Sequence, residues 1–203
     1  MPGPYTITPP VQGQPIPSVG FGQAVKDAIN DLDARLSAVE GSLLPRYYIK
    51  GGATSRNTTT TPSTDTGTGQ LLAGIPLEIG TFEIELVGLF NLTTTGTQGI
   101  KTQWGFSGTA NGATCIRTCM GPGDSATSQS ANQLGVYSAA QATNQTASYF
   151  NAASAGWSGF REIAANFIVT AAGTLSLSWS QAVSSANNTN LQGGSYFRIT
   201  RYA

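Results

Sequence analysis

Glu83 and Glu85 are the two carboxylates whose spacing could support catalysis. They alternate with apolar residues, so on a β-strand both would point to one face, about 7 Å apart. That separation suits an inverting glycosidase, in which one carboxyl group acts as the acid and the other as the base. The solvent-facing side of any sheet gives the same alternation. This second interpretation is favoured, and no catalytic residue is predicted.

The chain contains no histidine, which excludes Ser-His-Asp and Cys-His nucleophiles, histidine-ligated zinc and histidine bases. Cys115 and Cys119 would lie about 13 Å apart on a strand, beyond the reach of a disulfide. Two thiols also cannot complete a zinc site, so both are expected to be half-buried thiols. Asp65 and Asp124 stand alone in predicted loops, without the clustered oxygens of a calcium loop. We therefore expect no metal and no cofactor.

A polar stretch from Ser125 to Ser158 offers a possible ligand surface, because aromatic side chains beside amides line many carbohydrate sites. The same aromatic residues are equally ordinary as packing residues in loops or at a subunit contact. A site for a host-surface glycan therefore remains open. Its aromatic residues are Tyr137, Tyr149, Phe150 and Trp157.

Composition narrows the class of partner. The chain has 203 residues, with ten basic and ten acidic side chains. A nucleic-acid binder needs a basic field, so nucleic acid is not an expected partner. No apolar run approaches the roughly 20 residues of a membrane span, and the N-terminus lacks a secretory pattern. The chain is expected to fold in a cytoplasm, away from membranes.

Residues 45–203 predict one β domain. Apolar residues recur there with period two, and Phe82, Ile84 and Leu86 give the clearest case. Residues 51–69 are predicted to be a Thr-rich loop, and Ala172-Gly173 to be a tight hairpin turn. The fold class is mostly β, an antiparallel β-sandwich of jelly-roll type. The predicted strands are Arg46–Lys50, Thr81–Phe90, Ile100–Phe106, Thr114–Met120, Leu134–Ser138, Phe160–Thr170, Thr174–Ser180 and Ser195–Tyr202.

Residues 1–20 predict an extended arm before this domain, because they hold six of the ten prolines. Proline fixes φ and removes an amide donor, so neither a helix nor a central strand is expected. The arm is either a disordered tail or a segment that lies on another protein surface. For the second interpretation, the docking candidates are Ile7, Val11 and Ile16.

Residues 21–44 predict a short coiled-coil helix. Their apolar residues recur at steps of four and three, which makes a seam narrow enough for a partner helix. Arg35 and Glu40 occupy g and e positions that form ion pairs between parallel helices. The seam does not fix the number of helices, and a single helix packed on its own domain is the other interpretation. The seam residues are Val25, Ile29, Leu32, Leu36, Val39 and Leu43.

The order of arm, helix and β domain resembles small structural proteins of tailed bacteriophages, above all those of actinobacteria. The firm part covers residues 14–40, with Phe21-Gly-Gln-Ala-Val-Lys-Asp-Ala-Ile-Asn-Asp-Leu-Asp-Ala-Arg-Leu-Ser-Ala-Val-Glu40 as its helix. The ending, Gly173-Thr-Leu-Ser-Leu-Ser-Trp-Ser-Gln181 and Gly194-Ser-Tyr-Phe-Arg-Ile199, is similar to the last strands of trimeric tumour-necrosis-factor and C1q jelly rolls. Neither resemblance supplies a catalytic residue.

The phage resemblance implies a non-enzymatic virion protein, a homotrimer that decorates the capsid. The arm would dock on the major capsid protein, or on a tail protein if the chain is a tail component. One alternative is a minor tail protein or short tail fibre that binds a host cell-wall glycan. A glycan depolymerase and a bacterial C1q-like adhesion module are further alternatives.

Overall fold

The computed structural model describes residues 23, 25–33, 35, 44–66, 72–93, 98–122, 134–139, 142–150 and 157–202. Contacts divide the chain into two units, Met1–Ser42 and Leu43–Ala203. The predicted arm, with Ile7, Val11 and Ile16, lies outside the described residues.

The second unit is a sandwich of two antiparallel sheets, which confirms the predicted fold class. In the described residues, sheet A has the order β1-β14-β5-β11-β8-β9, with β13 beside β5, β2 beside β13 and β7 beside β11. Sheet B has the order β10-β6-β12-β3, with β4 on β12. The strands are β1 (Arg46–Ile49), β2 (Thr54–Arg56), β3 (Ser63–Thr64), β4 (Ile75–Leu77), β5 (Gly80–Leu92), β6 (Ile100–Phe106), β7 (Thr109–Ala110), β8 (Arg117–Pro122), β9 (Leu134–Ala139), β10 (Thr146–Tyr149), β11 (Trp157–Ala171), β12 (Gly173–Gln181), β13 (Thr189–Leu191) and β14 (Tyr196–Arg201), with a 3-10 helix, η1, at Asn111–Ala113.

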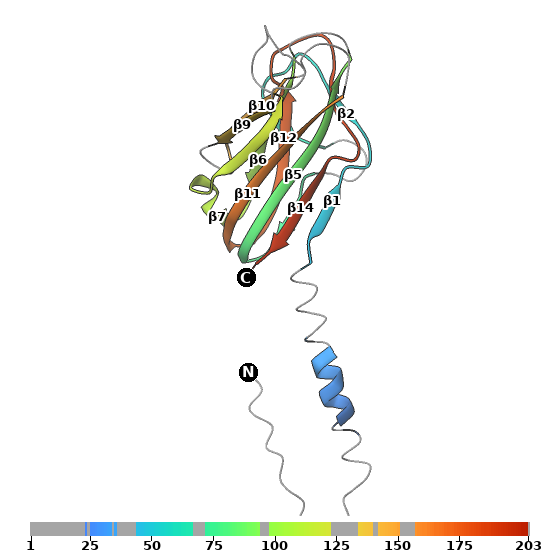
Figure 1. Ribbon diagram of the computed structural model, residues 1–203, viewed down its shortest axis with the longest axis vertical. Helices are drawn as coiled ribbons and strands as arrows, with labels where there is room; N and C mark the ends of the chain where they lie inside the picture. The colour runs from blue at the N-terminus through green and yellow to red at the C-terminus, as the bar shows by residue number, and fades with distance from the viewer. Residues whose placement is uncertain are drawn as a thin grey trace, which may run out of the picture. The chain divides into compact units, whose positions relative to one another are not determined.

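Neighbouring strands in each sheet come from distant parts of the chain. In sheet A, β5 lies between β14 and β11, which run side by side with it in Figure 1. In sheet B, β6 pairs with β12. Successive strands repeatedly change sheet, which is the connectivity of a jelly roll built from Greek keys.

The predicted alternation is confirmed along the central strands. Phe82, Ile84 and Leu86 of β5 face the core and are buried. The same pattern buries one side of β12, at Leu175, Leu177 and Trp179, and one side of β6. Period-two burial therefore forms a single apolar layer between the two sheets.

Aromatic side chains fill this layer. Trp104 of β6 meets Phe197 of β14 edge to face, with ring centroids 5.4 Å apart. Phe160 of β11 pairs with Gly88 of β5 and stacks on Tyr149 at 4.5 Å. A Cβ on Gly88 would lie 2.0 Å from the Phe160 ring, so only glycine leaves room for that ring.

The predicted hairpin at Ala172-Gly173 is wrong. β11 belongs to sheet A and β12 to sheet B, so the chain crosses between the sheets at this point. The crossing brings Gly173 against Gly108, where a Cβ on Gly173 would lie 2.2 Å from the Gly108 nitrogen. The glycine is required by close packing rather than by a hairpin turn.

The predicted 51–69 loop contains two short strands, β2 and β3. The structure also adds β4, β7, β10 and β13 to the predicted strands. β8 begins three residues later than the predicted strand Thr114–Met120. The added strands are short and rich in Ser, Thr or Pro, so they lack the long apolar alternation that identifies β5. They are β2, β3, β4, β7, β10 and β13.

A fully buried ion pair joins Arg117 of β8 to Glu162 of β11, with 3.3 Å between Nη1 and Oε2. Tyr149 and Thr102, which lie on sheet B, both donate hydrogen bonds to Glu162 Oε1. The Arg117 guanidinium also lies 5.2 Å from the Trp104 ring centroid. This polar cluster therefore connects the two sheets inside the apolar layer.

Replacing Arg117 by Met should lower the free energy of unfolding by about 3–5 kcal/mol, because it leaves the Glu162 carboxylate buried without its cation. The double variant Arg117→Met, Glu162→Gln should be more stable than the single variant, since the amide carries no charge. Urea unfolding of the three proteins measures both differences. A single variant with the wild-type midpoint would contradict this account.

Candidate functional site

The exposed stripe of the helix is the first candidate site. Residues 25–33 are helical, and Val25, Ile29 and Leu32 share one face of that helix at steps of four and three. Their exposed fractions are 41%, 58% and 62%. Three apolar side chains in water on one face leave a surface that another helix could cover. Leu36, Val39, Leu43 and Glu40 lie outside the described residues.

Arg35 forms an ion pair with Asp31 of its own helix, at 3.9 Å, and both side chains are exposed. Gln23 donates a hydrogen bond to Asp27 on the same helix, at 2.8 Å. Such i, i+4 contacts support a short helix by a few tenths of a kcal/mol. The predicted pairing of Arg35 with Glu40 of another copy stays a prediction.

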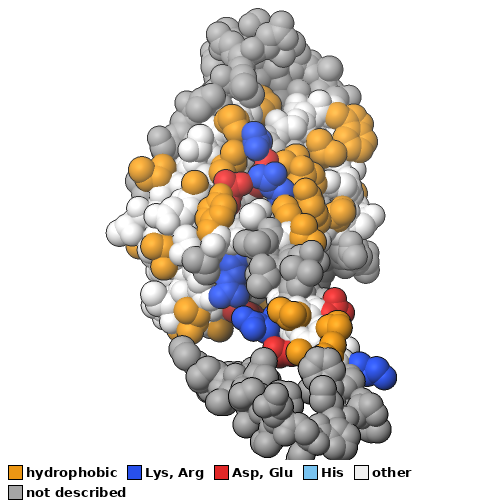
Figure 2. Space-filling model, turned by 60° about the horizontal axis from the view of Figure 1, so that its bottom comes forward, with side chains coloured by type: hydrophobic (Ala, Val, Ile, Leu, Met, Phe, Trp, Pro, Cys, Tyr) orange, Lys and Arg blue, Asp and Glu red, His pale blue; other side chains and the backbone are white. Residues whose placement is uncertain are grey.

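The outer face of sheet A carries a network of ion pairs around Glu83 and Glu85. Arg198 of β14 contacts Glu83 at 2.7 Å and Glu85 at 2.8 Å. Arg161 of β11 binds the other oxygen of Glu85, and the Tyr202 hydroxyl donates to Glu83 at 2.8 Å. Figure 2 shows basic and acidic side chains touching, with hydrophobic side chains beside them.

Electrostatics of this network favour the Arg198 cation and the neutral form of the Tyr202 phenol. Burial disfavours the Arg198 cation, but the carboxylates of Glu85 and Glu83 outweigh it and raise the pKa of Arg198. The hydrogen bond to Glu83, together with burial, raises the pKa of Tyr202. Both carboxylates are thus ion-pair partners of arginine on the outer face of sheet A.

The polar stretch proposed as a glycan surface divides into different environments. Tyr149 and Phe150 are buried, and Tyr149 binds Glu162 in the core. Trp157 begins β11 and is 66% exposed. Nothing is described of the Tyr137 side chain. Two of the four aromatic residues therefore pack inside the domain and do not offer a stacking surface for a sugar.

Cys115 and Cys119 are buried and form no disulfide. Cys119 lies on β8. Cys115 comes before this strand, and the Cys115 thiol contacts the Ala165 carbonyl. Burial raises the pKa of the Cys115 thiol. Beside it, β8, β11 and η1 border an open depression of about 620 Å³, lined partly by Ile116, Met120 and Ile163.

The expectation that Asp65 stands alone in a loop is wrong. Its carboxylate is buried and forms an ion pair with Lys50 at 2.7 Å. No local sequence pattern reveals this pair, because Lys50 follows β1 and lies fifteen residues before Asp65 in the chain. Within the described residues, no cluster of His, Cys, Asp or Glu could hold a metal ion. The helical residues described include no segment that could span a membrane.

No protein-family model and no curated protein matches the chain. Two solved structures show weak similarity. One is a family two carbohydrate esterase from Cellvibrio japonicus, with TM-score 0.27, 9% identity, and coverage of 76% of this chain and 35% of the other. The second is from the infectious bursal disease virus Gx strain, with TM-score 0.17, 13% identity, and coverage of 79% and 42%. The chain spans less than half the length of either protein.

Native protein should react with a thiol reagent at pH 8 at least about tenfold more slowly than the urea-unfolded chain. Only the thiolate reacts, and burial both raises the pKa of Cys115 and shields its sulfur. Reaction of both thiols in urea, and of one thiol in a Cys115→Ser variant, provides the control. One thiol that reacts rapidly in the native protein would contradict the described burial.

Proposed function

We propose that this protein is a non-enzymatic structural component of a phage particle, a homotrimer that decorates the head. The helix brings three copies together through its apolar stripe, and the arm attaches them to the major capsid protein. The β-sandwich then faces solvent. The assignment to a phage rests on the resemblance of residues 14–40. The exposed apolar stripe of the helix supports the proposed mode of assembly.

The observation that carries the proposal is the exposure of Val25, Ile29 and Leu32 on one helical face. Burying each such side chain stabilises an assembly by about 1.5–3 kcal/mol. A helix of about three heptads is marginal alone, so it gains most of its stability by packing on other helices. Three identical helices could bury these apolar side chains against one another, so no further partner would be needed.

A trimer also explains how a short arm could hold a protein on a particle. Three weak arm contacts on a single assembly act with a high effective concentration, which increases the overall affinity far beyond one contact. Within the described residues, most charged side chains of the sandwich form ion pairs with one another, which leaves little charge to oppose association with a surface.

The variant Ile29→Asp, Leu32→Asp should be monomeric at micromolar concentration in analytical ultracentrifugation, because charges would enter the buried seam. The loss should exceed about 2 kcal/mol for each replaced side chain in each copy. The matched control is Asn30→Asp, Ala34→Asp, which adds the same charge at positions b and f and should remain trimeric. A trimer that survives the seam variant would exclude this mode of assembly.

Deletion of residues 1–20 should leave the trimer intact and abolish its binding to particles that lack the protein. Co-sedimentation with those particles measures binding, and electron microscopy shows where the intact protein lies. Density repeated over the head is expected. Density confined to the tail would favour the minor tail protein instead.

A further inference from the structure

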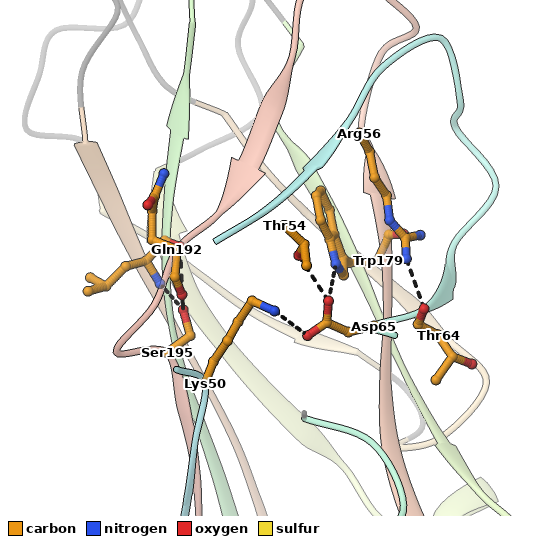
Figure 3. A network of polar contacts seen from close by, with 9 residues as sticks. Lys50, Thr54, Arg56, Thr64, Asp65, Trp179, Gln192 and Ser195 are labelled. Carbon is orange, nitrogen blue, oxygen red and sulfur yellow. Dashed lines mark hydrogen bonds and ion pairs between the residues drawn. The ribbon is translucent and has the colours of Figure 1, made fainter. Parts of the chain in front are cut away.

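Lys50 and Asp65 form an ion pair that water hardly reaches. Lys50 directly follows β1, and Asp65 directly follows β3. Lys50 Nζ lies 2.7 Å from Asp65 Oδ2, and the side chains are 1% and 0% exposed. Figure 3 shows the Lys50 side chain pointing toward the Asp65 carboxylate. Two buried charges cost desolvation energy that a neutral product would not.

The backbones on both sides of the pair are held in place. The Lys50 N–H donates to the Ser195 carbonyl at 2.8 Å, and the Lys50 carbonyl accepts from Gly194 at 2.7 Å. The Asp65 N–H donates to the Leu177 carbonyl at 3.0 Å. These bonds attach Lys50 beside sheet A and Asp65 beside sheet B. The amine and the carboxyl carbon are therefore kept in proximity, which lowers the entropy cost of a reaction between them.

The second carboxylate oxygen, Asp65 Oδ1, accepts two hydrogen bonds. Thr54 Oγ1 donates at 2.9 Å and the indole N–H of Trp179 at 3.3 Å. The Arg56 guanidinium lies over the Trp179 ring, with its central carbon 4.6 Å from the ring centroid, and it donates a hydrogen bond to the Thr64 carbonyl. These contacts hold the indole in place. Both donors thus point to the oxygen that would carry negative charge if a nucleophile added to the carboxyl carbon.

We propose that Lys50 and Asp65 condense to form an intramolecular amide cross-link. One proton passes from the ammonium to Asp65 Oδ2, which leaves an amine and a carboxylic acid. The amine nitrogen then bonds to Asp65 Cγ, and Oδ1 becomes the oxyanion held by Thr54 and Trp179. The Cγ–Oδ2 bond breaks, a second nitrogen proton moves to Oδ2, and one water leaves. No oxidant, reductant or other reactant is consumed.

The cross-link has a definite structural consequence. β1 is the last strand at one side of sheet A, and β3 is the last strand at one side of sheet B. An amide between the residues that follow them ties the two sheets together covalently at their edges. It closes the loop that contains β2 and β3, as a disulfide would, without depending on redox conditions. This inference is independent of the proposed function.

Mass spectrometry of the full chain under denaturing conditions tests the cross-link. Wild-type protein should be lighter than its sequence requires by one water molecule. Trypsin should yield a branched product in which residues 47–56, uncut at Lys50, are joined to residues 57–101. Fragmentation should place the junction between Lys50 and Asp65.

Lys50→Arg is the matched control, because it keeps a cation beside Asp65 but supplies no primary amine. Its mass should equal the full value for its sequence. Wild-type protein at full mass would overturn the proposal and leave an ion pair only. A water loss that persists in Lys50→Arg, or that maps to a linear peptide, would overturn it as well.

Discussion

The antiparallel pairing of β5 with β11 is the contact on which sheet A depends, since β14 extends it on one side and β8 on the other. Its inner side sets Phe160 over Gly88, and its outer side brings Arg161 to Glu85. A one-residue shift of β5 would turn Glu85 toward the core, whereas a one-residue shift of β11 would turn Phe160 toward water. Ring packing and charge therefore fix the same register from opposite faces.

The few charges of the sandwich are used mainly against one another. Two of its ion pairs are completely buried, and one network covers the outer face of sheet A. Buried pairs contribute little net stability, but the loss of either member is costly, so they select one arrangement of the strands. They also leave a surface with little charge to repel another copy. The pairs are Lys50–Asp65, Arg117–Glu162, Arg198 with Glu83 and Glu85, Arg161–Glu85 and Arg201–Glu78.

The sequence predicts which side of a strand is buried, but it does not predict what lies across from it. Period two correctly assigned Phe82, Ile84 and Leu86 to the core, since alternation depends only on neighbours in the chain. The partners of Asp65 and Glu162 come from other strands, so no local pattern reveals them. For the same reason Ala172-Gly173 resembled a hairpin, although the strands on either side enter different sheets. At the candidate site, spacing identified the stripe of Val25, Ile29 and Leu32, whereas no local pattern shows what would cover it.

In the proposed trimer, the helix and the sandwich would have different tasks. A seam of three heptads is specific in register but weak, because short helices lose much entropy when they order. The sandwich carries few charges, so contacts between three copies would meet little electrostatic repulsion. If three helices aligned as proposed, each sandwich would meet its neighbours at a high effective concentration. Weak contacts between the domains would then suffice: the helix would set the number of copies, and the domains would add to the stability of the assembly.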